Sequence, residues 1–430
     1  MSPEENFDYS TYLSPFTWRY GSEDMRKIFS EIKTRSNWRK MWASIAEVQS
    51  EYGLVSKEEV NDLKTKVSEK HINLKRAHII ENKIRHDLMA EIKTFAEQAP
   101  IGGGKIHLGA TSADIEDNTD ALKILQASSI ILTRLVNAID SMAKNITKYA
   151  DLPCMAWTHL QPAEPTTVGY RFANYAQDLL LDISNIENFR NNILKGKGLK
   201  GAVGSSAGYK QLLKEKATPK EFEEKVMDHF GLDSFPITTQ TYPRKMDHLI
   251  LSILSSISQS VHKFGLDIRI LQSPVFGEIS EPVSKSQVGS STMAFKRNPV
   301  SSERMCSLAR YVSTLPNNTF MNAAFNILER TLDDSANRRI VIPEGFLAVD
   351  ECLSLYDKIS CNISVNKIMI KHNLEKFGVF SGTEAILMEM VKRGSDRQKM
   401  HEKIRIYSFK AWDDISNGKK NPLRYLIIND

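Results

Sequence analysis

Residues 250–271 read ILSILSSISQSVHKFGLDIRIL, and this stretch decides the fold. Its apolar residues follow one another at alternating spacings of four and three: Ile250, Leu254, Ile257, Val261, Phe264, Ile268 and Leu271. These spacings place all seven side chains on one stripe of an α-helix, like the a/d seam of a coiled coil over about three heptads. The stretch therefore predicts a long helix that buries one stripe against other helices.

Two more segments carry helical patterns of similar length. The first lies between Asp117 and Pro153 and repeats every seven residues at Leu125, Leu132, Ile139 and Ile146, with Leu135 and Met142 as companion positions. The second follows Pro165 and repeats at Val168, Phe172, Tyr175, Leu179, Ile183 and Ile186. Each helix could exceed about 25 residues, or roughly 37 Å at 1.5 Å per residue. We therefore predict an all-α fold with a central long-helix bundle, and association of chains through the 250–271 seam and its neighbours.

The rest of the chain supports a helical fold divided by loops. A solenoid is the alternative, but the sequence shows no internal repeat of 30–45 residues. Strand patterns are scarce, and the best candidate is a short hairpin near residues 196–208. The helix with Met25, Ile28 and Ile32 has Ser22 as its cap. We predict three domains: an N-terminal helical domain at 1–112, a central long-helix domain at 113–364, and a small C-terminal helical domain at 365–430.

Residues 274–299 form a loop between two strong helices in this interpretation. The segment contains three Pro, two Gly and six Ser or Thr. A polar loop of this length in a helical protein is more often functional than idle. We expect it to be open without ligand and to close over a bound substrate.

The composition is that of an ordinary globular protein. Hydrophobic residues make up 41% and charged residues 25% of the 430 residues, which excludes general disorder and collagen-like repeats. The net charge of +5 comes without a long Lys/Arg run, so a site for a small polyanion explains it as well as nucleic-acid binding does. No apolar run approaches the roughly 18 residues that cross a bilayer, and the acidic N-terminus has no apolar signal segment. We expect a cytoplasmic protein that binds neither membrane nor nucleic acid.

The four cysteines are Cys154, Cys306, Cys352 and Cys361, and they form no CxxC pair. No His pattern accompanies them. We expect reduced core cysteines, with neither a disulfide framework nor a zinc site.

Five segments concentrate side chains suited to chemistry: residues 85–87, 105–112, 158–162, 289–299 and 329–339. They contain three histidines near loops, a Gly-Ser-Ser loop with a lysine six residues after its first serine, and clustered arginines. Each feature also has a structural explanation: a half-buried or turn histidine, a flexible linker, or a solvated helix face with internal ion pairs. The combination suits acid–base chemistry on an anionic substrate.

Residues 289–299, GSSTMAFKRNP, resemble the GSSxMPxKxNP signature of the fumarase/aspartase superfamily, which is long and highly specific. Further matches cover nearly the whole chain, at residues 14–20, 85–87, 107–112, 158–159, 240–242, 302–304, 329–339 and 401–405. The run ERTLDDSANRR is similar to that of the branch acting on succinylated purine nucleotides, and it separates this branch from fumarases and argininosuccinate lyases. Ala294 departs from the signature, which has Pro there, and should leave the loop less preorganised.

The resemblance implies an all-α, three-domain fold in which four copies join into a 20-helix core and each active site draws on three subunits. It implies an enzyme that releases fumarate by anti β-elimination from two small purine nucleotides, adenylosuccinate and the succinocarboxamide ribotide of purine synthesis. The family's reaction uses no metal ion and no organic cofactor, so we expect none. The alternatives are another lyase of the superfamily, such as argininosuccinate lyase, and a binding or structural homologue that has lost its chemistry.

The resemblance also assigns catalytic roles. Ser290 corresponds to the general base and His159 to the general acid that protonates the leaving nitrogen, and the presence of both disfavours lost chemistry. Glu303 corresponds to the carboxylate that orients His159. Lys296 and Asn298 would hold the succinyl carboxylate on which negative charge develops.

The remaining matched residues would bind substrate. Thr111, Ser112 and Gln240 would hold the succinyl part. The residues that would receive phosphate and other polar groups are Arg19, Tyr20, His86, Arg304, Arg330, Ser335 and Arg339. Arg85 and Asp87 are also expected to bind substrate, and His86 is counted with the catalytic residues as well.

Overall fold

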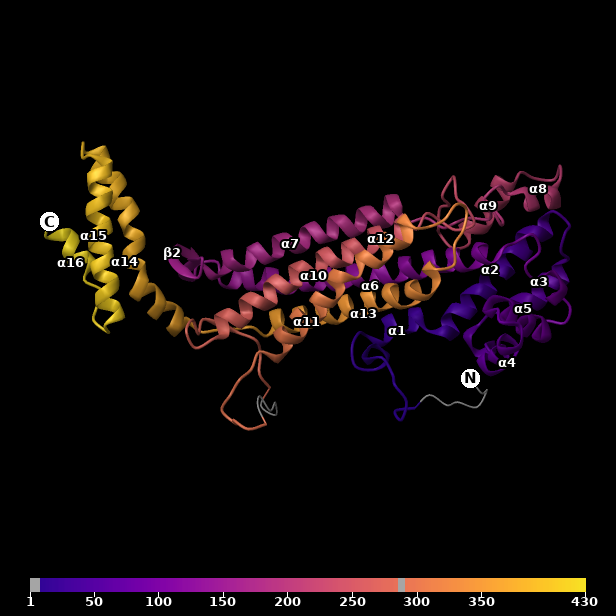
Figure 1. Ribbon diagram of the computed structural model, residues 1–430, viewed down its shortest axis with the longest axis horizontal. Coiled ribbons are helices and arrows are strands. Elements are labelled where there is room, and N and C mark those ends of the chain that lie inside the picture. The colour runs from indigo at the N-terminus through magenta and orange to yellow at the C-terminus, as the bar shows by residue number, and fades with distance from the viewer. Residues whose placement is uncertain (1–7, 285–290) are drawn as a thin grey trace. The chain divides into compact units, whose positions relative to one another are not determined.

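The computed structural model describes residues 8–284 and 291–430 and consists mainly of α-helices (Figure 1). Contacts group the chain into two compact units. Unit 1 comprises the described residues of Met1–Val136, Leu181–Gln259 and Ser307–Ser354. Unit 2 comprises those of Asn137–Leu180, Ser260–Cys306 and Leu355–Asp430. The three-domain division stays a prediction, because these units are groups of contacts and not continuous segments of chain.

Unit 1 begins with helical elements, several of which start at a serine whose hydroxyl accepts a hydrogen bond from the first turn. They are η1 (Pro15–Thr17), α1 (Glu23–Phe29), α2 (Glu31–Glu51), α3 (Lys57–Lys64), η2 (Glu69–His71), α4 (Leu74–Ile84), α5 (Asp87–Gln98) and η3 (Gly103–Lys105). The Ser22 hydroxyl accepts a hydrogen bond from the Met25 amide, and Ser30 accepts one from Lys33. Ser30 therefore ends α1 and begins α2, so the single helix predicted through Ile32 is in fact two.

The aromatic core of unit 1 lies between α2, α5, α8 (Ala207–Leu213) and α9 (Pro219–Asp228). Trp42 of α2 packs on Phe95 of α5 with ring centroids 6.2 Å apart. Tyr209 of α8 packs on Phe222 of α9 at 5.4 Å. All four rings are buried, so they fix the helices that surround the start of the first long helix.

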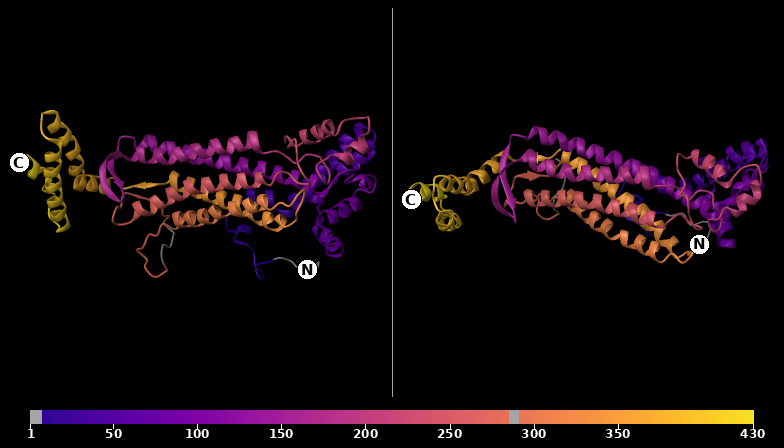
Figure 2. Two further views of the ribbon diagram at one scale, coloured as in Figure 1. Left: turned by 45° about the horizontal axis from the view of Figure 1, so that its top comes forward. Right: turned by 90° about the horizontal axis from the view of Figure 1, so that it is seen from above.

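Four long helices contribute residues to both units: α6 (Ser112–Lys148), α7 (Val168–Asn188), α10 (Lys245–Gln272) and α13 (Asp334–Cys361). Within each unit their segments lie side by side (Figure 2). In unit 1, Arg134 of α6 donates to Asp350 of α13 at 2.9 Å. In unit 2, Ser141 of α6 donates to Asp357 of α13 at 2.5 Å. The predicted long-helix bundle is confirmed in this form.

The seam of residues 250–271 is buried, with six of its seven side chains having no exposed surface. In unit 2, the Phe264 ring of the seam lies 5.4 Å from Tyr175 of α7 and 4.2 Å from Tyr356 of α13. The prediction that chains associate through this seam is therefore wrong. Helices of the same chain cover the stripe, and an apolar period does not reveal which chain supplies its partner.

The other two long patterns are confirmed with changes. On α6 the companion residues Leu135 and Met142 are completely buried, whereas the row at Leu125, Leu132, Ile139 and Ile146 is only half-buried. α7 has 21 residues, fewer than predicted, and continues into one π-helical turn, η4 (Phe189–Ile193). By length and composition alone α6 passes as a membrane-spanning helix. Its apolar residues Ile124 and Ile131 are buried, as in a core helix.

Unit 2 contains two small antiparallel sheets. β1 (Pro153–Thr158) pairs with β2 (Gln161–Thr167), and β3 (Ile279–Ser280) pairs with β4 (Ser364–Val365). The hairpin predicted near residues 196–208 is absent from that stretch, where Gly196 makes one isolated bridge to Ser234. Three glycines there, at 198, 201 and 204, adopt positive φ, which bends the backbone away from an extended strand.

The remaining helices are α11 (Val300–Thr314), α12 (Pro316–Ala324), α14 (Lys367–Lys392), α15 (Arg397–Ser416) and α16 (Leu423–Ile428). In unit 2, Phe380 of α14 stacks on Trp412 of α15 at 5.0 Å. All four cysteines are free thiols, as predicted, but Cys361 is exposed and is not a core residue.

Candidate active site

Unit 1 contains a cavity of about 320 Å³ lined by α1, α2, α4, α5, α6, α13 and the segments before α10 and α13. Four of the predicted substrate-binding residues line it: Asp87, Arg330, Ser335 and Arg339. Nine further charged residues on its wall were not predicted: Glu31, Arg35, Glu81, Glu116, Asp117, Asp120, Lys123, Arg244 and Arg338. The cavity therefore has three arginines on α13 or just before it, at positions 330, 338 and 339, and three carboxyl groups on α6, at positions 116, 117 and 120.

Arg244 connects the two walls of the cavity. Its guanidinium donates to both Asp117 oxygens at 3.0 and 3.2 Å and to Asp334 at 2.6 Å. Asp334 in turn accepts from Arg330 at 2.9 Å. Burial opposes ionisation of Asp334, but Arg244 and Arg330 lower the pKa of its carboxyl below the usual value. The predicted phosphate ligand Arg330 is thus held in place through a buried ion-pair chain.

Arg338 of α13 is fixed in the same way, by its own set of buried partners. It donates to Asp247 at 2.7 Å, to the Tyr242 hydroxyl at 2.6 Å and to Asp120 at 3.3 Å. Burial alone would raise the pKa of Asp120, but Lys123 and Arg338 lower it to about 2. Asp120 is therefore an anion at neutral pH.

Arg339 lies beside the start of α5, at the predicted segment 85–87. It donates to Asp87 at 2.7 Å while its side chain remains 61% exposed. Burial opposes ionisation of Asp87, but the Arg339 guanidinium lowers the pKa of its carboxyl. The His86 ring caps α5 by accepting from the Met89 amide at 3.4 Å, and Arg85 adopts φ +56° at the end of α4. An arginine with most of its surface open can still receive an oxyanion.

Glu116, on the α6 wall, has a carboxyl whose pKa lies well above the usual value. Burial, and then the nearby carboxylates of Asp87, Asp117 and Asp120, raise the pKa of Glu116 to about 8, with Arg339 opposing. A protonated carboxyl adds no negative charge to a cavity that faces an anionic ligand.

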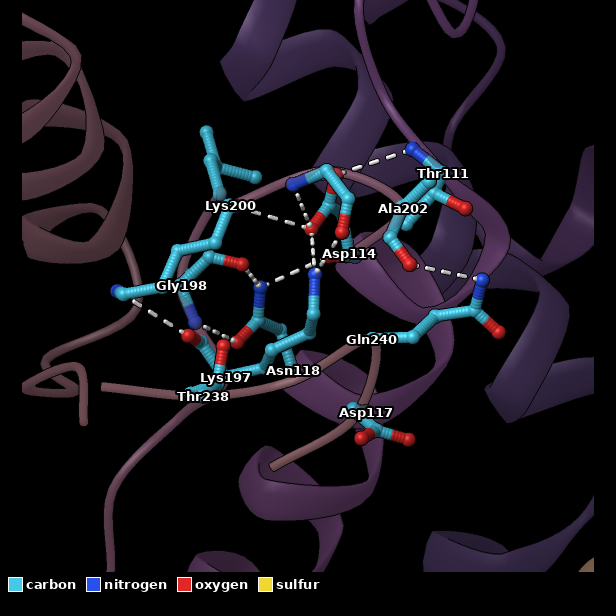
Figure 3. Close-up of polar contacts among 12 residues, drawn as sticks. Thr111, Asp114, Asp117, Asn118, Lys197, Gly198, Lys200, Ala202, Thr238 and Gln240 are labelled. Atoms are coloured by element: carbon cyan, nitrogen blue, oxygen red, sulfur yellow. Dashed lines mark hydrogen bonds and ion pairs between the residues drawn. The ribbon is translucent and has the colours of Figure 1, made fainter. Parts of the chain in front are cut away.

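Thr111 and Ser112 lie at the start of α6, above a buried polar cluster (Figure 3). The Thr111 amide donates to the Asp114 carboxylate at 3.0 Å. The same carboxylate accepts from the Gly201 amide, in the loop before α8. Gln240 contacts this loop as well, because its side-chain amide donates to the Ala202 carbonyl at 3.0 Å. Its backbone amide donates to the Glu329 carbonyl at 3.2 Å, next to Arg330. The three residues predicted to hold the succinyl part thus share one supporting structure.

Two other segments of unit 1 that the sequence singled out, at residues 19–20 and at His107, make aromatic and hydrogen-bond contacts outside the cavity lining. The Arg19 guanidinium lies 4.4 Å from the centre of the Trp18 ring, and the Tyr20 ring meets Phe16 edge-on at 5.9 Å. His107 accepts a hydrogen bond from the Trp42 indole at 3.0 Å, and burial lowers the pKa of its ring. His107 therefore matches its structural explanation, that of a neutral turn histidine.

In unit 2, His159 occupies the tip of the β1–β2 hairpin. His159 and Leu160 form the two-residue turn, with φ of +55° and +59°. These are the φ signs of a type I′ turn, which usually contains Asn-Gly. Left-handed backbone costs a residue with a side chain about 1–2 kcal/mol, and such strain concentrates at functional sites. The turn presents an exposed histidine where the sequence predicted the general acid.

The other predicted catalytic and substrate-binding residues of unit 2 lie on and before α11. Lys296 is exposed in the loop, Asn298 is half-buried, and Glu303 and Arg304 are exposed in the first turns of α11. Within the described chain, no hydrogen bond or ion pair joins Glu303 to His159. Ser290 lies outside the described residues, so the general base and the closing loop stay predictions.

The comparisons with known proteins agree over most of the chain. Residues 28–313 match the model of a lyase family. The chain is 41% identical over 408 residues to the adenylosuccinate lyase of Saccharomyces cerevisiae, covering 94% of this chain and 84% of the relative. It is 40% identical over 428 residues to that of Schistosoma mansoni, covering 98% and 88%.

Solved structures show the same fold at lower identity. The 3-carboxy-cis,cis-muconate lactonizing enzyme of Pseudomonas putida superposes with a TM-score of 0.84 at 23% identity, covering 97% of this chain and 90% of that one. A fumarate lyase of Mesorhizobium sp. BNC1 superposes with a TM-score of 0.82 at 20% identity and the same coverage. The helical fold, the arginine-lined cavity and these matches define a lyase of the fumarase/aspartase superfamily. Within it, the chain belongs to the adenylosuccinate lyase family.

Proposed function

We propose that this chain catalyses the adenylosuccinate lyase reaction. It releases fumarate by anti β-elimination from adenylosuccinate, giving AMP, and from succinylaminoimidazole carboxamide ribotide, giving AICAR. The observation that carries the proposal is the 41% identity to an adenylosuccinate lyase over 94% of the chain. As a carbon–nitrogen lyase it serves purine biosynthesis, and the expected compartment is the cytoplasm.

The cavity of unit 1 supports a nucleotide substrate. Arg330 and Arg339 are the cations for the phosphate, with Ser335 as a hydroxyl donor between them in sequence. Guanidinium groups suit this role because their planar fork binds oxyanions in pairs. The surrounding ion pairs hold the arginines before the ligand arrives, which lowers the ordering cost of binding.

The chemistry falls to the residues that the family resemblance assigns. Ser290, as an alkoxide, removes the proton from the β-carbon of the succinyl group, and the electron pair forms the carbon–carbon double bond as the C–N bond breaks. His159 gives its proton to the leaving nitrogen. Lys296 and Asn298 stabilise the charge that develops on the neighbouring carboxylate. No metal or organic cofactor enters these steps.

We also propose that the protein is a homotetramer whose active sites each draw on three subunits. No hydrogen bond or ion pair joins Glu303 to His159 among the residues that the structure describes, which fits a site that a second chain completes. Unit 1 also exposes several apolar side chains by more than half of their surface: Phe320, Met321, Phe325, Leu328 and Leu332. Light scattering should give four chains, and a fully active monomer would overturn this part of the proposal.

The test of function is fumarate release followed by absorbance. The purified protein should turn over adenylosuccinate, and Ser290→Ala should abolish turnover while nucleotide still binds, since Arg330 and Arg339 are unchanged. Turnover of argininosuccinate without turnover of adenylosuccinate would replace the proposed activity. A Ser290→Ala variant that keeps more than about a tenth of the rate, a loss below roughly 1.4 kcal/mol, would remove Ser290 from the role of base.

A further inference from the structure

The carboxylate of Asp114 is a buried junction for several segments of unit 1 (Figure 3). It accepts hydrogen bonds from the Lys197 ammonium, from the amides of Lys200 and Gly201 at 3.2 Å, and from the Tyr209 hydroxyl at 3.3 Å. Thr111 supplies a further amide at 3.0 Å. A carboxylate with this many donors fixes the distance between the start of α6 and the loop of residues 197–202, which we call the strap.

Lys197 completes the junction. Its side chain and that of Asp114 have no exposed surface, and its ammonium also donates to the Gly201 carbonyl at 3.2 Å. Next to it, Asn118 of α6 accepts from the Gly198 amide at 2.9 Å and donates to the Gly198 carbonyl at 3.1 Å. Burying an ion pair adds little net stability compared with packed apolar residues, so such a pair is better explained by the conformation it specifies.

The strap contacts both parts of the predicted succinyl-binding group. Through Asp114 it holds Thr111, and hence Ser112 at the first position of α6. Through the Ala202 carbonyl, directly after Gly201, it holds the side-chain amide of Gln240 at 3.0 Å. A shift of the strap therefore moves Gln240 relative to Thr111 and Ser112.

We propose that Asp114 and Lys197 are positioning residues that set Thr111, Ser112 and Gln240 for the dicarboxylate end of the substrate. This inference rests on the proposed function. The nucleotide end is held separately, because Arg330 and Arg339 are fixed by Asp334 and Asp87. The pair should therefore govern recognition of the four-carbon acid and leave recognition of the nucleotide unchanged.

The test compares inhibition of wild type and variant by the two products, fumarate and AMP. A Lys197→Met, Asp114→Asn double variant removes the ion pair without leaving an unpaired buried charge. We expect its inhibition constant for fumarate, and its KM for adenylosuccinate, to rise about tenfold. Its inhibition constant for AMP should stay within twofold of wild type. Lys197→Arg, which keeps the charge, should restore most of the fumarate inhibition.

A matched control removes the other buried ion pair of the same loop. Lys200 donates to Glu223 at 2.6 Å on the side of the strap that faces α9. A Lys200→Met, Glu223→Gln double variant loses a comparable pair, but the backbone amide of residue 200 still donates to Asp114, and the glutamine side-chain oxygen can still accept from the Leu199 amide. Both of its inhibition constants should stay within twofold of wild type.

The outcomes separate this inference from the function on which it rests. A wild type that releases no fumarate overturns the proposed function and the inference with it. An active wild type overturns the inference alone if the Asp114–Lys197 variant weakens both inhibitors equally or weakens neither. If that variant does not fold, Tyr209→Phe removes one donor to Asp114 and should raise the fumarate constant two- to threefold with AMP unchanged. An unchanged fumarate constant there would also overturn the inference.

Discussion

Arg244→Met should be among the most destabilising single substitutions in unit 1. The guanidinium makes three hydrogen bonds, to Asp117 at 3.0 and 3.2 Å and to Asp334 at 2.6 Å, and all three side chains are buried. Methionine fills much of the space but leaves two buried carboxylates without their shared cation. Breaking a buried pair in this way costs about 3–5 kcal/mol. Each carboxylate keeps one other donor, the Tyr242 amide for Asp117 and Arg330 for Asp334, so the loss should not double.

Urea denaturation at neutral pH and fixed protein concentration measures this loss. Arg339→Met is the matched control, because the Arg339–Asp87 pair has the same chemistry on a side chain that is 61% exposed. Exposed pairs contribute about 0–1 kcal/mol, so the control should unfold near the wild-type midpoint. A loss below about 1 kcal/mol for Arg244→Met, equal to that of the control, would refute the claim that Arg244 holds the cavity walls together.

Three other changes have expected outcomes. The pKa of Glu116 is about 8 in the folded protein, against a usual value of 4.5. Between these two pH values the folded state binds a proton that the unfolded state has lost, so the free energy of unfolding falls as pH rises, by at most about 1.4 kcal/mol per pH unit. Glu116→Gln removes this pH dependence. In thermal melts, the melting temperature of the variant should therefore rise relative to that of wild type from pH 5 to pH 8.5. A difference that stays constant with pH would contradict the raised pKa. His159→Gln should lower kcat by about 10²–10⁴ with the oligomer intact, whereas a near wild-type rate would reassign His159 to a structural role. Ile257→Ala, in the centre of the buried seam, should lower the unfolding free energy by about 2–5 kcal/mol, and a loss no larger than that of Ile257→Val would contradict its tight packing.

The burial of the long helices was predictable because helix geometry fixes the period of the pattern. Every seam residue from Ile250 to Leu271 is buried as the spacing requires. The covering partner was not predictable from the period, since a stripe on α10 looks the same whether α13 or a second chain packs on it. The interface predicted at this seam failed for that reason.

The hairpin of β1 and β2 was missed because its sequence lacks the usual signals. Two prolines, Pro162 and Pro165, lie in β2, and the turn contains His159 and Leu160 where Asn-Gly is typical. An unfavourable turn sequence can persist when the surrounding structure over-determines it. A histidine in a turn of unfavourable sequence, next to a strand that contains two prolines, therefore indicates a functional role.

The lining of the cavity was predictable where the family motif names residues, as at Arg330 and Arg339, which line it. The supporting ion pairs were not, because they join residues far apart in the chain. Arg244 and Asp117 are 127 positions apart, and Lys197 and Asp114 are 83 apart. Single charged residues with no neighbouring partner in sequence are indistinguishable from solvated surface charges until the fold pairs them.

The hydrogen bond between Arg134 of α6 and Asp350 of α13 has a consequence for synthesis of the chain. The two residues are 216 positions apart. At about 5–20 residues per second, a ribosome needs roughly 10–40 s to make the residues between them. During that interval the buried apolar residues of α6, such as Leu135 and Met142, are made but lack the helix that packs on α6. The nascent chain therefore exposes this apolar surface for longer than a protein whose neighbouring helices follow one another directly, and exposed apolar surface favours aggregation.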